Sequence, residues 1–315
     1  MPLRTPVTRR QTLLLGSTAV LAWPMLAAAA QPGQATQAVQ AVQSPAPSTP
    51  RIVASFSLLA DMARELAPAG VEVWALVGAN ADAHVYTPTP ADVRRLAQAD
   101  VVVLNGLGFE GWIERMVKVS GFRGAMVVAS RDIQPRRVGG AADPHAWQDL
   151  GMARSYAITL SQAFAQRWPA QQAQIKQRGD EYVARIGQLD AQVRGWLGAV
   201  PRAQRRVITS HDALGYFGAA YGVDFFAAQG WNTHSEPSAA AVARLIRQIK
   251  QHHVRAVFVE NISDPRLLER IASEAGARVG GTLYSDALSL PGGPAATYLK
   301  LMEHNARSLA DALAA

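Results

Sequence analysis

Short β-branched runs alternate with segments of helical spacing in two separate series, and this alternation constrains the fold more than any other feature. The first series has runs at 51–56, 71–77, 99–106 and 124–130. The second has runs at 205–210, 223–228, 254–260 and 277–284. Strands that alternate with helices are typical of βα units and parallel sheets. The sequence therefore predicts an α/β fold of two lobes, each a mostly parallel sheet flanked by helices.

A segment without strand signals, roughly 149–199, separates the two series. From Pro169 to Leu197, apolar residues recur at helical spacing with polar residues between them. We expect one linking helix at 169–199, on the order of 40 Å long, between an N-terminal lobe at 51–168 and a C-terminal lobe at 200–315. A chain of 315 residues is long enough for two such lobes.

Residues 1–30 have the layout of a cleaved signal peptide. A basic stretch ends in RR at 9–10, an apolar run covers 13–26, and AAA at 28–30 forms the cleavage site. The apolar run is short for a membrane span, although an uncleaved N-terminal anchor is the alternative. TRRQTLLLG resembles a twin-arginine signal, and the Sec route stays open as well. We expect export to the periplasm and loss of residues 1–30.

The segment 31–50 contains no charged residue and no hydrophobic periodicity, so we expect a flexible leader there. The formal net charge of the chain is +7; Arg4, Arg9 and Arg10 in the expected signal peptide contribute three of these charges, which leaves +4. This mild excess comes without Lys/Arg runs interleaved with aromatic residues. We therefore do not expect a nucleic-acid partner.

The chain contains no cysteine. This absence excludes disulfides, thiolate metal sites, cysteine nucleophiles and lipid attachment to a cysteine of this chain. A transition-metal site would have to use His, Asp or Glu.

Three of the seven histidines and one aspartate follow predicted strands. His84 follows the second strand, His145 follows the fourth, His211 comes directly after RRVITS, and Asp286 comes directly after ARVGGTLY. Ligands of parallel sheets bind beyond the carboxyl ends of the strands, so we expect these side chains to converge, two from each half. Three imidazoles and one carboxylate form a tetrahedral nitrogen and oxygen site that suits zinc.

Each such residue also has a simpler explanation. A single loop histidine is more often a surface or turn residue than a ligand. Asp82, Asp143 and Asp212 could be turn or helix-cap residues. Asp92 is expected to be a charge at a helix N-terminus.

Other polar residues near the expected site have more than one interpretation. His234 could be an auxiliary ligand, but we expect a plain loop residue. Glu236 and Glu260 could accept hydrogen bonds from ligand imidazoles, although Glu236 could equally prepare a helix start. His252 and His253 end a basic helix, where they would help to cap carbonyls, and they are not expected to be ligands.

Five segments together resemble the zinc/manganese solute-binding proteins of ABC transporters, the cluster A-I metal receptors. They are AHVYTPTPADV, DPHAWQD, SHDALGYF, SEPSA and FVENISDP, in the same order and spacing as in that family. The resemblance implies that His84, His145, His211 and Asp286 bind the metal, and that histidine at the third position favours zinc, with manganese as the alternative. It implies a receptor, not an enzyme, that hands its metal to a membrane permease. We expect it to be a monomer.

Two other functions stay open. Three histidines and a carboxylate could activate water in a zinc hydrolase, but the chain has no H-E-x-x-H or G-x-S-x-G string. A receptor for a chelated metal or an organic solute could line its cleft with Trp112, Trp147 and Trp231. Core packing explains these tryptophans as well.

Overall fold

The computed structural model describes residues 49–231, 233–235, 237–252, 254 and 256–314. The predicted signal peptide and all but the end of the leader lie outside these residues, as do Glu236 and His253. The described residues form one compact unit. No helix of the described part is long and apolar enough to cross a membrane.

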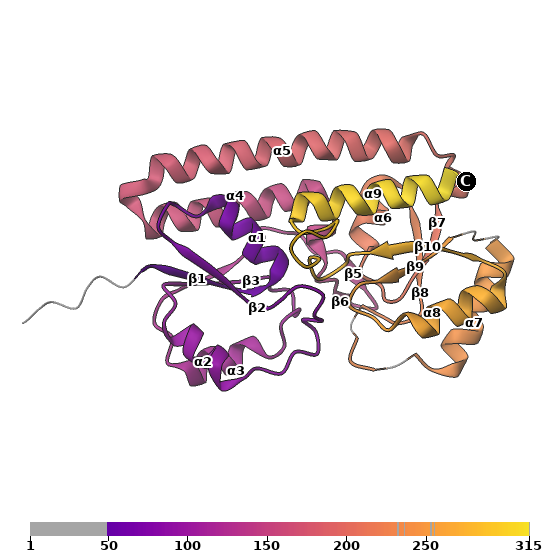
Figure 1. The fold of residues 1–315 in the computed structure, drawn as a ribbon, viewed down its shortest axis with the longest axis horizontal. Helices are drawn as coiled ribbons and strands as arrows, with labels where there is room; N and C mark the ends of the chain where they lie inside the picture. Colours follow the sequence, from indigo (N-terminus) through magenta and orange to yellow (C-terminus); the bar gives the residue numbers. More distant parts are fainter. Residues whose placement is uncertain (1–48, 232, 236, 253, 255, 315) are drawn as a thin grey trace, which may run out of the picture. The chain divides into compact units, whose positions relative to one another are not determined.

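Two four-stranded sheets lie at the centre of this unit (Figure 1). The first has the order β2-β1-β3-β4 and consists of β1 (Arg51–Phe56), β2 (Glu72–Val77), β3 (Val101–Leu104) and β4 (Ala125–Val128). The second has the order β10-β9-β7-β8 and consists of β7 (Arg206–Thr209), β8 (Asp224–Ala227), β9 (Ala256–Glu260) and β10 (Arg278–Leu283). Every strand pair in both sheets is parallel. The predicted fold class is confirmed.

Helices cover the sheets, so the inner strands are buried on both faces. β3 and β9 are buried along their whole length, as the continuous apolar runs VVVL and AVFVE require. The first half contains α1 (Ser57–Leu66), α2 (Pro90–Ala97), α3 (Ile113–Ser120), η1 (Ala146–Gln148) and α4 (Leu150–Arg167). The second half contains η3 (Arg202–Gln204), α6 (Gly215–Tyr221), α7 (Ala239–His252), α8 (Pro265–Ala275) and α9 (Tyr298–Ala314).

The long helix between the two sheets is α5 (Gln172–Gly198), which follows the short turn η2 (Pro169–Gln171). Its buried residues are the stripe expected from helical spacing, from Ile175 to Leu197. α5 packs against α1 and α4 of the first half and against α6 and α9 of the second (Figure 1). It therefore supports both lobes. The lobe boundaries stay a prediction, because α9 packs against α1 as well as β10.

A small antiparallel hairpin of β5 (Arg137–Val138) and β6 (Ala141–Ala142) precedes η1 and was not predicted. α2 begins with a capping box in which Thr89 and Asp92 satisfy each other's backbone N–H groups. Asp92 is thus a helix-start residue, as its position in the sequence indicated.

Candidate metal site

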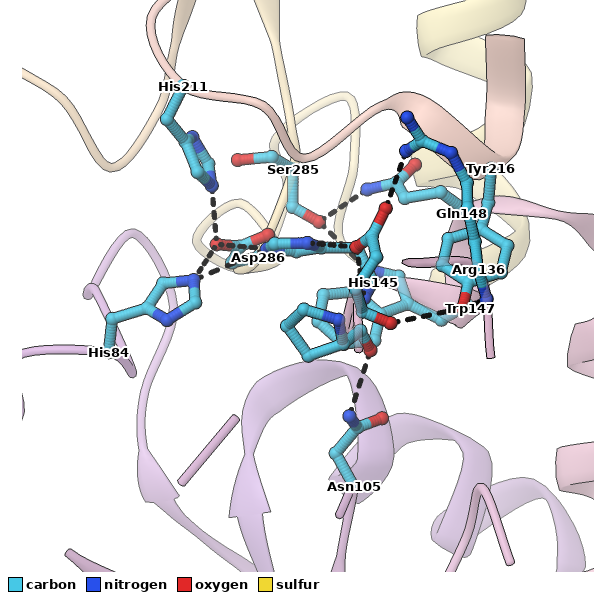
Figure 2. A network of polar contacts seen from close by, with 12 residues as sticks. His84, Asn105, Arg136, His145, Trp147, Gln148, His211, Tyr216, Ser285 and Asp286 are labelled. Carbon is cyan, nitrogen blue, oxygen red and sulfur yellow. Dashed lines mark hydrogen bonds and ion pairs between the residues drawn. The ribbon is translucent and has the colours of Figure 1, made fainter. Parts of the chain in front are cut away.

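The four side chains expected to converge do so at the carboxyl ends of the strands. His84 lies in the loop after β2, His145 lies just before η1, His211 follows β7 and Asp286 follows β10. One ligand atom from each residue lies within 4.8 Å of those of the other three. All four residues are buried; His84 is 3% exposed and the others are 0% exposed. Figure 2 shows the imidazoles arranged around the Asp286 carboxylate.

The imidazole Nε2 atoms point toward one carboxylate oxygen. Asp286 Oδ2 lies 3.2 Å from Nε2 of His84, 3.1 Å from Nε2 of His211 and 3.8 Å from Nε2 of His145. The Nε2 atoms of His84 and His145 are 3.3 Å apart. Four ligands about 2.1 Å from a tetrahedral zinc ion would lie roughly 3.4 Å from one another. The separations therefore match those of atoms that share one small cation.

A carboxylate orients His145 through Nδ1, the ring nitrogen that faces away from Asp286. Asp143 Oδ1 lies 2.8 Å from His145 Nδ1 and accepts the backbone N–H of His145 at 3.1 Å. Its Oδ2 accepts from Arg136 Nη1 at 2.7 Å. Gly215, at the start of α6, leaves the space that the Arg136 guanidinium occupies. Such a carboxylate fixes the tautomer that leaves Nε2 free for a metal.

A second carboxylate lies beside His211. Glu260, at the end of β9, accepts the His211 backbone N–H at 2.9 Å, and its Oε2 lies 2.7 Å from His211 Nδ1. Glu260 therefore lies beside the His211 imidazole, as expected for a residue that supports a ligand. Asp143 combines its predicted turn role with this partnership, for which the sequence had no local signal. Arg136 was missed altogether.

His84 is fixed differently. Its backbone N–H donates to Asp82 Oδ1 at 2.8 Å, so Asp82 is the predicted turn residue. The other Asp82 oxygen accepts from Thr233 Oγ1 of the second half of the chain at 2.5 Å. The His84 ring meets Phe109 edge-on, with 4.6 Å between ring centroids. One side of the site is therefore aromatic.

The charges of the site shift the pKa values of the histidines in opposite directions. Burial lowers the pKa of His84. Burial also opposes protonation of His145, but the Asp286 charge and the Asp143 hydrogen bond raise its pKa above the usual value. For His211, Glu260 and Asp286 outweigh burial and raise the pKa well above that value. Although burial favours the neutral acid, His211 and His145 hold the pKa of Asp286 well below its usual range.

The other histidines of the described residues lie outside this cluster. His252 ends α7 and stacks on Phe226, with 5.6 Å between centroids. Asp212 does not join the cluster either; its backbone N–H donates to Gly230 O.

Trp112 and Trp147 are buried in the core, as the core-packing explanation predicts. Trp147 is fully buried and packs on Phe56 and Phe109, while the Trp112 indole donates to Ala83 O at 2.8 Å. Trp231 is half-buried.

The fold consists of two α/β lobes joined by a long helix. A buried cluster of three histidines and one aspartate lies at the ends of their strands. This arrangement is typical of a metal-binding solute receptor. Residues 52–312 match the family described as "Zinc-uptake complex component A periplasmic", and the chain belongs to this family. It is thus a metal-binding receptor of a metal-uptake ABC transporter.

Relatives in this family are named for different metals. The zinc-binding protein TroA of Treponema pallidum is 31% identical over 275 residues, covering 84% of this chain and 89% of TroA. The manganese-binding lipoprotein MntA of Halalkalibacterium halodurans is 30% identical over 256 residues, covering 81% and 85%. The iron-binding protein YfeA of Yersinia pestis is 29% identical over 264 residues, covering 82% and 85%.

Solved structures agree with the fold. The periplasmic zinc-binding protein TroA from Treponema pallidum superposes with a TM-score of 0.81 at 29% identity, covering 84% of this chain and 99% of that one. A manganese-bound S38A mutant of a periplasmic metal-binding protein from Candidatus Liberibacter asiaticus has a TM-score of 0.78 at 28% identity, with the same coverage.

Proposed function

We propose that this receptor binds one Zn²⁺ through His84, His145, His211 and Asp286 and delivers it to the membrane permease of its transporter. The observation that carries the proposal is the set of three Nε2 atoms within 3.1 to 3.8 Å of one Asp286 oxygen, at full burial. Three nitrogens and one oxygen in a compact set suit zinc better than the oxygen-rich sites that manganese prefers. Manganese is the alternative, because relatives are named for manganese and iron as well as zinc.

The charge of the site supports a divalent cation. With neutral imidazoles, the carboxylates of Asp286, Asp143 and Glu260 and the guanidinium of Arg136 sum to two negative charges. Unbalanced charge away from water is costly, so an ion of charge +2 is the natural complement. A monovalent or trivalent ion would leave a buried charge uncompensated.

The burial of the ligands favours a free ion over a chelated metal. Because its ligands are 0 to 3% exposed, an organic chelator could surround the ion only by displacing them. The same four ligands complete the coordination of zinc, whereas catalytic zinc keeps a position open for water. The two carboxylates that contact ligand imidazoles, Asp143 and Glu260, are engaged there. We therefore infer capture and release without a catalytic step.

We infer that the receptor works as a monomer in the periplasm, after loss of residues 1–30. Family membership supports a place outside the cytoplasm and a permease partner. The A-x-A sequence at 28–30 supports cleavage before residue 31.

Competition dialysis tests the metal. Purified, metal-stripped protein is dialysed against equal concentrations of free Zn²⁺, Mn²⁺ and Fe²⁺, and the bound metal is measured by mass spectrometry. We expect one zinc per chain and little manganese or iron. His211→Ala should lose the zinc, and His252→Ala, a histidine outside the cluster, should keep it. A preference for manganese in the wild type would reject the zinc assignment, and retention of zinc by His211→Ala would reject the ligand set.

A further inference from the structure

The peptide carbonyl next to Asp286 is held by two side chains from the other half of the sequence. Ser285 O accepts hydrogen bonds from Trp147 Nε1 at 3.0 Å and from Gln148 Nε2 at 2.7 Å (Figure 2). Both donors lie in η1, directly after His145, and both are fully buried. The turn that follows His145 therefore forms hydrogen bonds with the backbone next to Asp286.

The segment on the far side of Asp286 is also bound to the N-terminal half. The Leu288 N–H donates to Ser57 Oγ at 3.0 Å, and Leu288 O accepts from the Asn80 N–H at 3.0 Å. Residues 285 and 288, on either side of Asp286, are thus bonded to the N-terminal half, while Ala287 O between them accepts from Asn261 Nδ2 of the second half at 3.1 Å. His211, in contrast, has its backbone N–H bonded to Glu260 of the second half, and Glu260 Oε2 lies 2.7 Å from His211 Nδ1.

Burial of the polar Gln148 side chain is unfavourable for the stability of the fold. Its side chain is 0% exposed, yet its Oε1 has no hydrogen-bond partner among the described residues. A buried amide with one unpaired end costs free energy, and an apolar side chain of the same length would avoid that cost. Ser285 Oγ and Asp286 Oδ1 are likewise buried without a partner. The one side-chain hydrogen bond that this amide makes among the described residues is the N–H bond to Ser285 O, and this bond positions the backbone next to Asp286.

We propose that Gln148 is a positioning residue that, together with Trp147, fixes Asp286 on the N-terminal lobe. His84, His145 and Asp286 then form a preformed group of three ligands, and His211 joins from the C-terminal lobe to complete the site. The role of Asp286 as a ligand rests on the proposed function, but its attachment to the N-terminal lobe does not.

The first test uses the metal-free protein. Gln148→Met keeps the length of the side chain and removes the donor. We expect faster amide hydrogen exchange in the peptide that covers residues 284–290, and unchanged exchange in the peptide that covers 206–212. Thr159→Val is the matched control, because it removes the hydrogen bond that the buried Thr159 hydroxyl donates to Asp132, elsewhere in the first half. Equal exchange at 284–290 in Gln148→Met and the control would overturn the proposal.

The second test uses metal. Gln148→Met should weaken Zn²⁺ binding by about tenfold, the lower range for residues that orient a ligand, and should change the visible absorption of the Co²⁺-loaded protein, which reports ligand geometry. Trp147→Phe, which removes the other donor, should change the same absorption. In an Asp286→Ala background, Gln148→Met should leave the remaining affinity unchanged. A loss of equal size in that background would show that Gln148 does not act through Asp286. If the wild type bound neither Zn²⁺ nor Co²⁺, the proposed function would fail, while the exchange test would still judge the positioning role.

Discussion

Zinc binding is expected to release about two protons per metal near pH 6.5. In the metal-free site, the pKa values of His145 and His211 are raised, and that of His84 is lowered. Just above pH 6.5, the first two imidazoles therefore still carry a proton on average, whereas His84 is already neutral. Asp286 is ionised, because its pKa is well below the usual range. A ligating imidazole must be neutral, so the metal displaces the two protons.

The displaced protons set the pH dependence of affinity. Each one changes the apparent affinity tenfold per pH unit, so two correspond to about a hundredfold per unit. This slope applies between the lowered pKa of His84 and the raised pKa values of the other two imidazoles. It approaches three protons below that window and zero above it. Three equal imidazoles near pKa 6.5, the expectation from residue types alone, would give up to a thousandfold per unit below about pH 6.

Calorimetry can count the protons directly. Zn²⁺ would be titrated into metal-free protein at pH 6.5 in buffers of different ionisation enthalpy, and the heat difference yields the number of protons released. Circular dichroism at each pH confirms that the fold is intact. A release of one proton or fewer would refute the charge arrangement derived from Asp286, Asp143 and Glu260. A release of three at this pH would show that the pKa of His84 is not lowered.

Four further outcomes are expected. His211→Ala should weaken Zn²⁺ binding by more than the roughly 10- to 100-fold typical of residues that only orient a ligand; a smaller loss in a chelator competition would place His211 outside the coordination sphere. Glu260→Gln should cost about 10- to 100-fold, because the amide cannot match the carboxylate beside the His211 imidazole; an unchanged affinity in the same assay would contradict that partnership. Free zinc at a hundred times its Kd should stabilise the fold by about 2.7 kcal/mol, seen as a higher melting temperature for the wild type and not for His211→Ala at the same zinc concentration. Mass spectrometry of periplasmic material should find a mature chain without residues 1–30, and a full-length membrane-bound species would reject the cleavage.

The metal-free protein has its own pH dependence, which follows from the sign of each shift. The raised pKa values of His145 and His211 contribute stability that is complete below pH 6.5 and is lost as pH rises through their folded values. The lowered pKa of Asp286 contributes stability that is present above its usual value and is lost as pH falls toward its folded value. Melting temperatures without metal should therefore fall as pH rises above 6.5, while zinc affinity increases.

Much of the architecture was determined by the sequence alone, because it depends on local periodicity. Alternating strands and helices predicted both parallel sheets, and the apolar stripe from Ile175 to Leu197 predicted α5. The carboxyl ends of parallel strands share one edge of a sheet. That rule, together with the family resemblance, selected His84, His145, His211 and Asp286 as the residues that meet.

Tertiary structure decided how those residues are held and charged. Gln148 and Ser285 are 137 residues apart, and Arg136 reaches Asp143 through a hairpin that has no periodic signal. Chain order divides the four residues two and two, yet hydrogen bonds attach the Asp286 segment to the N-terminal half. The division of the histidines into two with raised pKa and one with lowered pKa likewise depends on which carboxylate faces each ring. Residue type sets the ordinary pKa of an imidazole, but distances of 3 to 4 Å to neighbouring charges set its actual one, and only the folded chain establishes those distances.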